Sequence, residues 1–188
     1  MRVNWQNKQI ARLSIKNKHL FLFLFENGSL TRLIQDRCKG RFHIDLINES
    51  WGEAMSDEKN LLSLRNNEIT FIRESYLKCN NKKLVYARTV IPQPTLREQN
   101  QTLTKLGQKP LGEILFKNNN IYRKGMKYAK IPLSNKLHKK AMNHSVISSE
   151  IYGRQSIFCI KSKPLLVIEI FLPSIMECNE IAFRLKNT

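Results

Sequence analysis

The sequence predicts an α+β fold with an antiparallel sheet, and two observations carry this prediction. Two pairs of apolar segments, at residues 68–91 and 151–173, each combine strand-like patterning with a short polar turn, as β-hairpins do. The segments between them contain only short helical patterns, without the regular alternation of strand and helix that builds a parallel sheet. We therefore expect strands to pair mainly with their neighbours in the chain.

The first quarter of the chain is predicted to hold a core segment, a capped helix and a strand. Residues 1–18 are basic and weakly periodic, so we expect them to be loosely ordered. The apolar run at 20–25 fits a helix or strand of the core. Ser29 can cap a short helix over residues 30–34, and residues 41–47 alternate between polar and apolar as a strand does.

The first hairpin is the clearest local prediction. Residues 68–79 alternate regularly, Asn80 and Asn81 form a turn signal, and residues 83–91 make the second strand. Pro92 ends that strand because it has no N–H group to donate to a sheet.

The remaining elements complete the order of strands and helices. Thr95 and Glu98 have the spacing of a capping box that opens a helix, which Gly107 closes. The elements after it are a helical turn, a strand, a basic helix and the two strands of the second hairpin, at residues 110–116, 121–131, 133–145, 151–161 and 164–173.

Composition indicates one globular domain over residues 1–188 and a choice of anionic partners. The chain has 32 basic and 15 acidic residues, a net charge of +17, and 41% of its residues are hydrophobic. Such a composition excludes wholesale disorder and fibrous repeats. The charge is compatible with nucleic acid, an anionic membrane or a small anionic substrate.

The cysteines and histidines point to no metal site. Cys38, Cys79, Cys159 and Cys178 have neither zinc-site spacing nor a disulfide-framework pattern, so we expect four separate reduced thiols. The histidines form no metal-binding motif. The N-terminal apolar run is too short to cross a bilayer or to serve as a signal peptide, which favours a cytoplasmic chain without membrane insertion.

Two ionisable residues occupy positions where the strand pattern predicts a dry environment. Arg73 shares a face of its strand with Phe71 and Leu77, so its guanidinium should point inward. Glu169 interrupts the apolar run 165–172, which is typical of a strand buried on both faces. A buried charge is costly unless a partner or a ligand compensates for it.

The residues alone leave two interpretations of this pair open. Arg73 and Glu169 can form one internal ion pair that fixes strand register, or they can line a closed cavity in which the arginine holds an anionic group and the glutamate a hydroxyl. Arg88 can line the same cavity or support its residues, or it can be an edge-strand arginine that reaches solvent.

Six segments in a consistent order resemble the chorismate pyruvate-lyase family over about residues 23–173. They are Ser29-Leu-Thr-Arg32, Ile72-Arg-Glu-Ser-Tyr-Leu-Lys-Cys79, Ala87-Arg-Thr-Val-Ile-Pro92, Leu106-Gly-Gln-Lys-Pro-Leu-Gly-Glu-Ile-Leu-Phe116, Gly153-Arg154 and Lys163-Pro-Leu-Leu-Val-Ile-Glu-Ile-Phe-Leu-Pro173. The chain departs from the best-known member at Leu30 (Met there), Ala87 (Gly) and Glu113 (Arg).

The resemblance implies a lyase that converts chorismate into 4-hydroxybenzoate and pyruvate, at the start of ubiquinone synthesis, without metal or organic cofactor. It implies one antiparallel sheet with helical flaps that enclose an internal ligand pocket. Arg73 then holds the ligand carboxylate and Glu169 meets the hydroxyl end as the catalytic pair, and the backbone at Leu30 and Leu111 completes the substrate site. Arg88 is a second-layer candidate. We expect a monomer that binds chorismate and 4-hydroxybenzoate.

Two other functions compete with this prediction. The same fold resembles the effector-binding domain of certain bacterial transcription regulators, which bind small molecules without chemistry; only 28 residues precede Ser29, too few for the winged-helix domain that such regulators carry in front. Residues 117–140 hold eight lysines and arginines and no acidic residue, which suggests a nucleic-acid or membrane surface. No recognised nucleic-acid motif accompanies them, so we expect a solvated basic surface and no specific nucleic acid.

Overall fold

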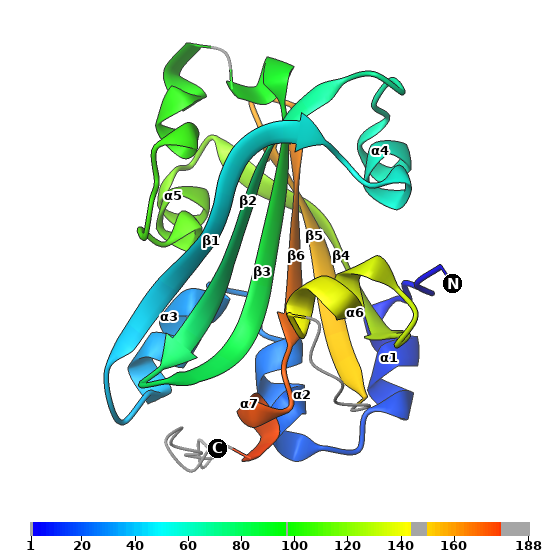
Figure 1. Cartoon of the computed structure of the whole chain (residues 1–188), viewed down its shortest axis with the longest axis vertical. Coiled ribbons are helices and arrows are strands. Elements are labelled where there is room, and N and C mark those ends of the chain that lie inside the picture. The colour runs from blue at the N-terminus through cyan, green and yellow to red at the C-terminus, as the bar shows by residue number, and fades with distance from the viewer. Residues whose placement is uncertain (1, 97, 144–149, 178–188) are drawn as a thin grey trace.

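One six-stranded antiparallel sheet, with strand order β1-β2-β3-β6-β5-β4, forms the centre of the computed structural model (Figure 1). The structure describes residues 2–96, 98–143 and 150–177. Its strands are β1 (Phe42–Glu53), β2 (Ile69–Cys79), β3 (Lys82–Pro92), β4 (Ile121–Ile131), β5 (Ile151–Ile160) and β6 (Lys163–Phe171). Every neighbouring pair runs antiparallel, which confirms the predicted fold class.

Both predicted hairpins are present, as β2–β3 and β5–β6. Asn80 in the first turn and Lys161 and Ser162 in the second have positive φ, the left-handed conformation that tight hairpin turns need. The two hairpins meet where β3 pairs with β6, so residues of the middle and last thirds of the chain lie side by side.

Short helices surround the sheet. They are α1 (Lys8–Ser14), α2 (Lys18–Leu24), α3 (Leu30–Arg37), α4 (Ser56–Leu62), α5 (Leu111–Lys117), α6 (Lys136–Ala141) and α7 (Ser174–Glu177). Ser29 caps α3 as predicted, because its Oγ accepts the N–H of Arg32. None of the described helices is both long and apolar enough to cross a membrane.

The expectation of a loosely ordered N-terminus is wrong for the part of it that the structure describes. Residues 8–14 form α1, and Ala11 packs into the same apolar cluster as Phe23. Gln6 exchanges backbone hydrogen bonds with Tyr128 of β4, at 2.7 and 2.9 Å. Contacts of this kind come from tertiary packing, which weak local periodicity does not reveal.

The predicted capped helix between residues 95 and 107 is also wrong. Two 3₁₀ helices, Gln93–Leu96 and Glu98–Thr104, take its place. The hydroxyl of Thr95 donates to the carbonyl of Pro164 at 2.8 Å, so this group ties the segment to the start of β6. A capping-box spacing therefore did not produce an α-helix here.

The two faces of the sheet carry separate sets of side chains. On one face two apolar clusters lie apart, one under α2 and α3 and one under α5 and the 3₁₀ helices. The other face holds a third cluster under α4 and α6 (Figure 1). Strand alternation assigns odd-numbered residues of β2, β3 and β6 to the first face and even-numbered ones to the second.

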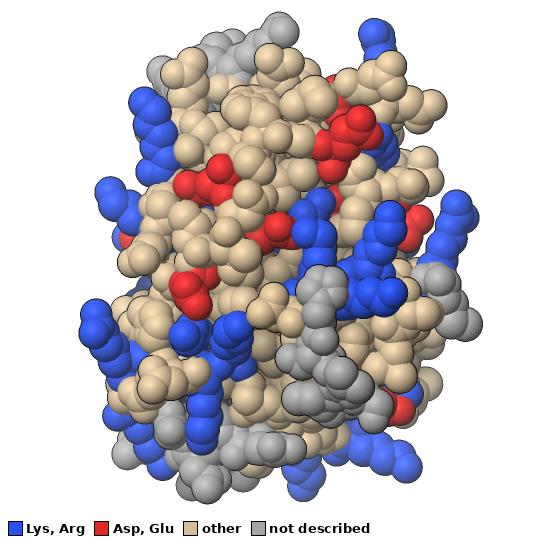
Figure 2. Space-filling view, viewed as in Figure 1, with Lys and Arg blue, Asp and Glu red and all other residues tan. Residues whose placement is uncertain are grey.

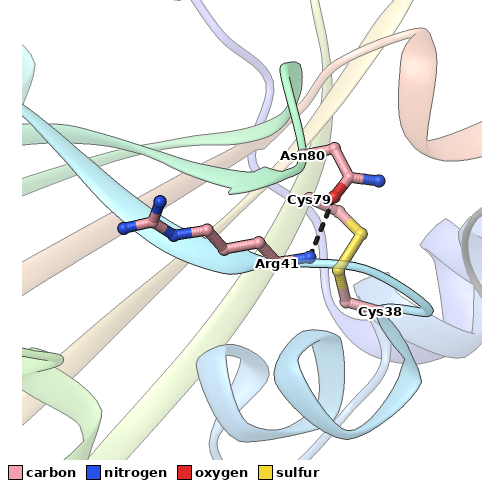
Figure 3. Close-up of a disulfide and its surroundings, with 4 residues drawn as sticks. All are labelled: Cys38, Arg41, Cys79 and Asn80. Carbon is pink, nitrogen blue, oxygen red and sulfur yellow. Dashed lines mark hydrogen bonds between the residues drawn. A yellow bond between two sulfur atoms is a disulfide. The ribbon is translucent and has the colours of Figure 1, made fainter.

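A disulfide joins Cys38 to Cys79, with 5.8 Å between their Cα atoms (Figure 3). The expectation of four separate thiols is thus wrong for this pair; Cys159 is free and buried, and Cys178 lies outside the described residues. Cys38 follows α3 directly and Cys79 ends β2, so the bridge fastens the helix to the tip of the first hairpin. The Asn80 side chain adds a second tie by accepting the N–H of Arg41 at 2.8 Å.

Candidate active site

A cavity lies on the first face of the sheet, and all four predicted substrate-site residues line it. These residues are Leu30, Arg73, Leu111 and Glu169. The floor comes from the strands, where small side chains such as Ala87 leave room above the sheet, and the cover comes from the beginnings of α3 and α5. The structure thus brings together residues that are far apart in the sequence.

Arg73 is buried and held from three sides. Its Nε donates to Oε1 of Glu49 on the paired strand β1 at 3.2 Å. Its Nη2 donates to the carbonyls of Gly107 and Lys109 at 2.9 and 3.2 Å. Burial lowers the pKa of the guanidinium, and the Glu49 carboxylate opposes this shift. The side chain is therefore a cation fixed in position before any ligand arrives.

Glu169 has a different partner from the one proposed as an alternative. Its Oε2 accepts Nε of Arg154, which faces it on β5, at 2.5 Å. The interpretation of an internal Arg73–Glu169 ion pair is wrong, because each residue is paired with another side chain of opposite charge. Both residues instead line the cavity, as the second interpretation predicts.

Leu30 and Leu111 are the first residues of α3 and α5. The N–H groups in the first turn of a helix have no acceptor within the helix, so they are available to an oxygen nearby. The two helix starts also touch: a Cβ atom added at Gly112 would lie 2.7 Å from Oγ of Ser29. The flaps thus meet over the cavity.

Arg88 lies on the opposite face of the sheet, away from the cavity. Strand β3 is central in the sheet, so both the cavity position and the edge position considered for Arg88 are corrected. Its side chain is 3% exposed, donates twice to Glu58 of α4 at 2.7 and 2.9 Å, and donates to Glu74 at 2.8 Å. Arg88 is the centre of a buried charge network between α4 and the sheet.

Two cavity arginines were missed as site residues by the sequence analysis. Arg154 was recognised only as part of a family motif, and Arg123 only as one charge of the basic segment 117–140. The alternation of β5 gave a usable signal for Arg154, since it shares a face with Phe158. No such signal existed for Arg123, because a bulge between Arg123 and Gly125 shifts the alternation of β4.

Charged side chains are dispersed over the face of the molecule drawn in Figure 2. Figure 2 shows basic side chains interspersed with acidic and uncharged surface. Within the basic segment, Lys117 pairs with Glu113, Lys130 with Glu150 and Lys140 with Glu74. Three of the eight basic residues of the segment are therefore paired with an acidic side chain. Among the described residues, no cluster of histidine, cysteine and acidic side chains has the makeup of a metal site.

Comparison with known proteins identifies close sequence relatives. A family model described as "Chorismate lyase" matches residues 1–181. A protein named "Probable chorismate pyruvate-lyase" from Methylococcus capsulatus is 35% identical over 162 residues, which cover 85% of this chain and 98% of the relative. A protein of the same name from Nitrosomonas europaea is 35% identical over 160 residues, covering 83% and 88%.

Solved structures resemble this chain in fold alone. PhnF from Mycobacterium smegmatis superimposes with a TM-score of 0.58 at 11% identity, over 81% of this chain and 67% of that one. The C-terminal domain of the histidine utilization repressor from Pseudomonas syringae gives a TM-score of 0.55 at 10% identity, over 79% and 98%.

Proposed function

The chain belongs to the chorismate lyase family, a family of C–O bond-cleaving enzymes, and from this premise we propose that it converts chorismate into 4-hydroxybenzoate and pyruvate. The observation that carries the proposal is the common cavity of Arg73 and Glu169, two ionisable residues from different strands, beneath the first residues of α3 and α5. We also propose a monomer that acts in the cytoplasm and supplies ubiquinone synthesis; the support for these is the family resemblance.

The reaction does not require a covalent intermediate with the protein. Chorismate carries a carboxylate on its ring, a ring hydroxyl and, on the carbon beside it, an enolpyruvyl ether with a second carboxylate. The C–O bond to the enolpyruvyl group breaks and the ring carbon that bears the hydroxyl loses its hydrogen, so the ring becomes aromatic. The enolpyruvate gains a proton at its methylene carbon and becomes pyruvate. The enzyme has to orient the ring, stabilise changing charge and exclude water.

The cavity residues suit these tasks. The Nη1 group of Arg73 can donate to the ring carboxylate, and the ties of its Nε and Nη2 groups to Glu49 and two carbonyls set the orientation of the guanidinium in advance. Glu169 can accept a hydrogen bond from the ring hydroxyl and take part in proton movement at that end. The first-turn N–H groups at Leu30 and Leu111 can donate to ligand oxygens.

The direct test is to incubate the purified chain with chorismate and to measure aromatic product and pyruvate in parallel. We expect 4-hydroxybenzoate by chromatography and an equal amount of pyruvate by a coupled lactate dehydrogenase assay. Chorismate that stays intact would overturn the proposed function. A chain that binds chorismate without converting it would instead support a ligand-sensing module of the same fold.

Variants assign the chemistry to the two site residues. We expect Glu169→Gln and Arg73→Ala each to lower kcat/KM by at least roughly 100-fold, the usual scale for one well-placed electrostatic or acid–base group. The exposed residues Glu113 and Arg65 give matched controls as Glu113→Gln and Arg65→Ala. Near-normal activity in either site variant would remove that residue from the assignment.

A further inference from the structure

Arg123 is a cavity residue that the proposed chemistry does not yet use. It lies on β4 opposite Phe158 of β5, directly before the bulge that ends at Gly125. Before the bulge the odd-numbered residues of β4 face inward, and after it the inward positions are Met126 and Tyr128. The extra residue thus lets β4 direct Arg123 toward the cavity while its later half packs on the core.

The guanidinium of Arg123 is incompletely paired. Its Nη1 donates to the carbonyl of Asn27 at 2.5 Å, but its Nε is buried without a hydrogen-bond partner among the described residues. Its charged centre lies over the rings of Phe116 and Phe158, 5.1 and 4.8 Å from their centroids. No carboxylate of the described part of the chain forms an ion pair with it. The other two cavity arginines, by contrast, each have one.

The electrostatics of the cavity make this cation costly when no ligand is bound. Burial, and after it the charge of Arg154, lower the pKa of Arg123, while the charge of Glu169 acts in the opposite direction. The other two arginines that line the cavity, Arg73 and Arg154, are paired with the carboxylates of Glu49 and Glu169, so Arg123 is the one guanidinium of the described lining that lacks a counter-charge. A ligand carboxylate beside Arg123 supplies that counter-charge.

We infer that Arg123 is the second anion-binding residue of this cavity and that it holds the enolpyruvyl carboxylate of the substrate. This inference rests on the proposed function. In the sheet, β2 and β4 are separated by β3, β6 and β5, so Arg73 and Arg123 approach the cavity from opposite sides with Glu169 between them. In the substrate the ring carboxylate and the hydroxyl lie at opposite ends of the ring, and the enolpyruvyl ether is attached to the carbon next to the one that bears the hydroxyl. The enolpyruvyl carboxylate therefore projects from the hydroxyl end of the ring, away from the ring carboxylate.

A contact between Arg123 and the enolpyruvyl carboxylate would affect the binding of the substrate and of the aromatic product differently. The enolpyruvyl carboxylate leaves with pyruvate when the C–O bond breaks, and 4-hydroxybenzoate keeps only the ring carboxylate and the hydroxyl. Arg123 therefore contributes to the binding of chorismate and not to that of 4-hydroxybenzoate, whereas Arg73 and Glu169 contact both.

Arg123→Met tests this difference. We expect kcat/KM for chorismate to fall by at least about 100-fold, the scale of a lost charge-assisted hydrogen-bond pair, and the Kd of 4-hydroxybenzoate to change by less than about threefold. Lys124→Met removes one exposed charge from the same strand and should leave both quantities near wild type. Arg123→Lys keeps the charge and should recover part of the loss. An Arg123→Met enzyme with normal kcat/KM would overturn the inference while the proposed function stands.

A modified substrate tests the same contact in the wild-type enzyme as well, where the folding of a variant plays no part. Chorismate esterified with methanol at the enolpyruvyl carboxylate should be a poor substrate for the wild-type enzyme, and Arg123→Met should use the ester and chorismate within about threefold of each other. Wild-type enzyme that uses both equally well contradicts the inference. Wild-type enzyme that forms no 4-hydroxybenzoate from chorismate itself contradicts the proposed function, and the inference with it.

Discussion

Arg154 and Glu169 face each other across β5 and β6, and one guanidinium joins the Glu169 carboxylate to the end of α2. Its Nε donates to Glu169 at 2.5 Å, and its Nη1 donates to the carbonyl of Glu26 at 2.6 Å and more weakly to that of Phe23 at 3.3 Å. The side chain is 1% exposed. Arg154 therefore positions Glu169, and it also holds the chain that leads to α3.

Substitutions of Arg154 should separate its effect on the orientation of Glu169 from its effect on the stability of the fold. Arg154→Met leaves the Glu169 carboxylate and several carbonyls without their donor and should lower the free energy of unfolding by about 3–5 kcal/mol. Arg154→Lys keeps the charge but lacks the planar fork, so we expect a smaller loss of stability and a fall in kcat of about tenfold or more. Urea unfolding and steady-state kinetics measure the two effects. Full kcat in Arg154→Lys would show that the orientation of Glu169 does not depend on the fork.

The contact between Gly112 and Ser29 sets how tightly the flaps close. Gly112→Ala forces the Ser29 hydroxyl aside, which costs α3 its cap, worth about 1 kcal/mol. We expect weaker binding of 4-hydroxybenzoate, by about fivefold, and faster release in a stopped-flow experiment, because flap opening limits the escape of a ligand from a closed cavity. Gly52→Ala, whose added Cβ meets only an ordinary contact at 3.6 Å, is the matched control and should release product at the wild-type rate.

Acid should destabilise the protein through Glu74, on the face away from the cavity. Burial acts to raise the pKa of this carboxyl, but hydrogen bonds from Tyr86 and Lys140 and the charge of Arg88 outweigh it and hold the pKa below its ordinary value of 4.5. The unfolded chain therefore binds a proton at Glu74 before the folded chain does. The stabilisation is complete above about pH 4.5 and is lost as the pH falls further through the folded-state pKa.

Urea unfolding of wild type and Glu74→Gln between pH 3 and pH 7 measures this contribution. We expect Glu74→Gln to be the less stable protein at pH 7 and the difference to shrink on acidification. A stability difference that is independent of pH would mean that the ionisation of Glu74 does not contribute.

The Cys38–Cys79 disulfide should be a large part of the stability. It closes a loop with a sequence separation of 41, for which the chain-entropy model gives about 4 kcal/mol. We expect a phosphine reductant to lower the midpoint of urea unfolding, and the Cys38→Ser/Cys79→Ser protein to match reduced wild type. Cys159→Ala keeps the disulfide and should remain sensitive to reductant. Thiol titration of the unreduced protein checks the bond itself.

Strand patterning predicted much of the fold and half of the charged site. Side chains alternate between the two faces of a strand, so the pattern alone identified Arg73 and Glu169 as inward charges and located both hairpins. Their true partners, Glu49 and Arg154, depend on register and strand order, which alternation does not encode. Arg123 was not identified as an inward-facing residue, because one extra residue in β4 interrupts the alternation of inward and outward side chains along that strand.

The errors share a physical origin in contacts between distant segments. The bridge between Cys38 and Cys79 needs the hairpin tip to return to the end of α3, and spacing along the chain says nothing about that approach. Thr95 similarly donates to Pro164, on a strand that begins far along the chain. Predictions from local sequence patterns were correct for segments whose structure does not depend on a contact with a residue far along the chain.

The disulfide also decides how the flap can move. Helix α3 is eight residues long, about 12 Å. The disulfide links the end of its last turn to β2, while its first turn covers the cavity. It therefore behaves as a lever with its pivot at Cys38. A rotation of about 10° at the pivot would swing the Leu30 end by about 2 Å, and the pivot itself would hardly move. The bond that fixes one end of the helix thus confines its motion to the end that meets the ligand.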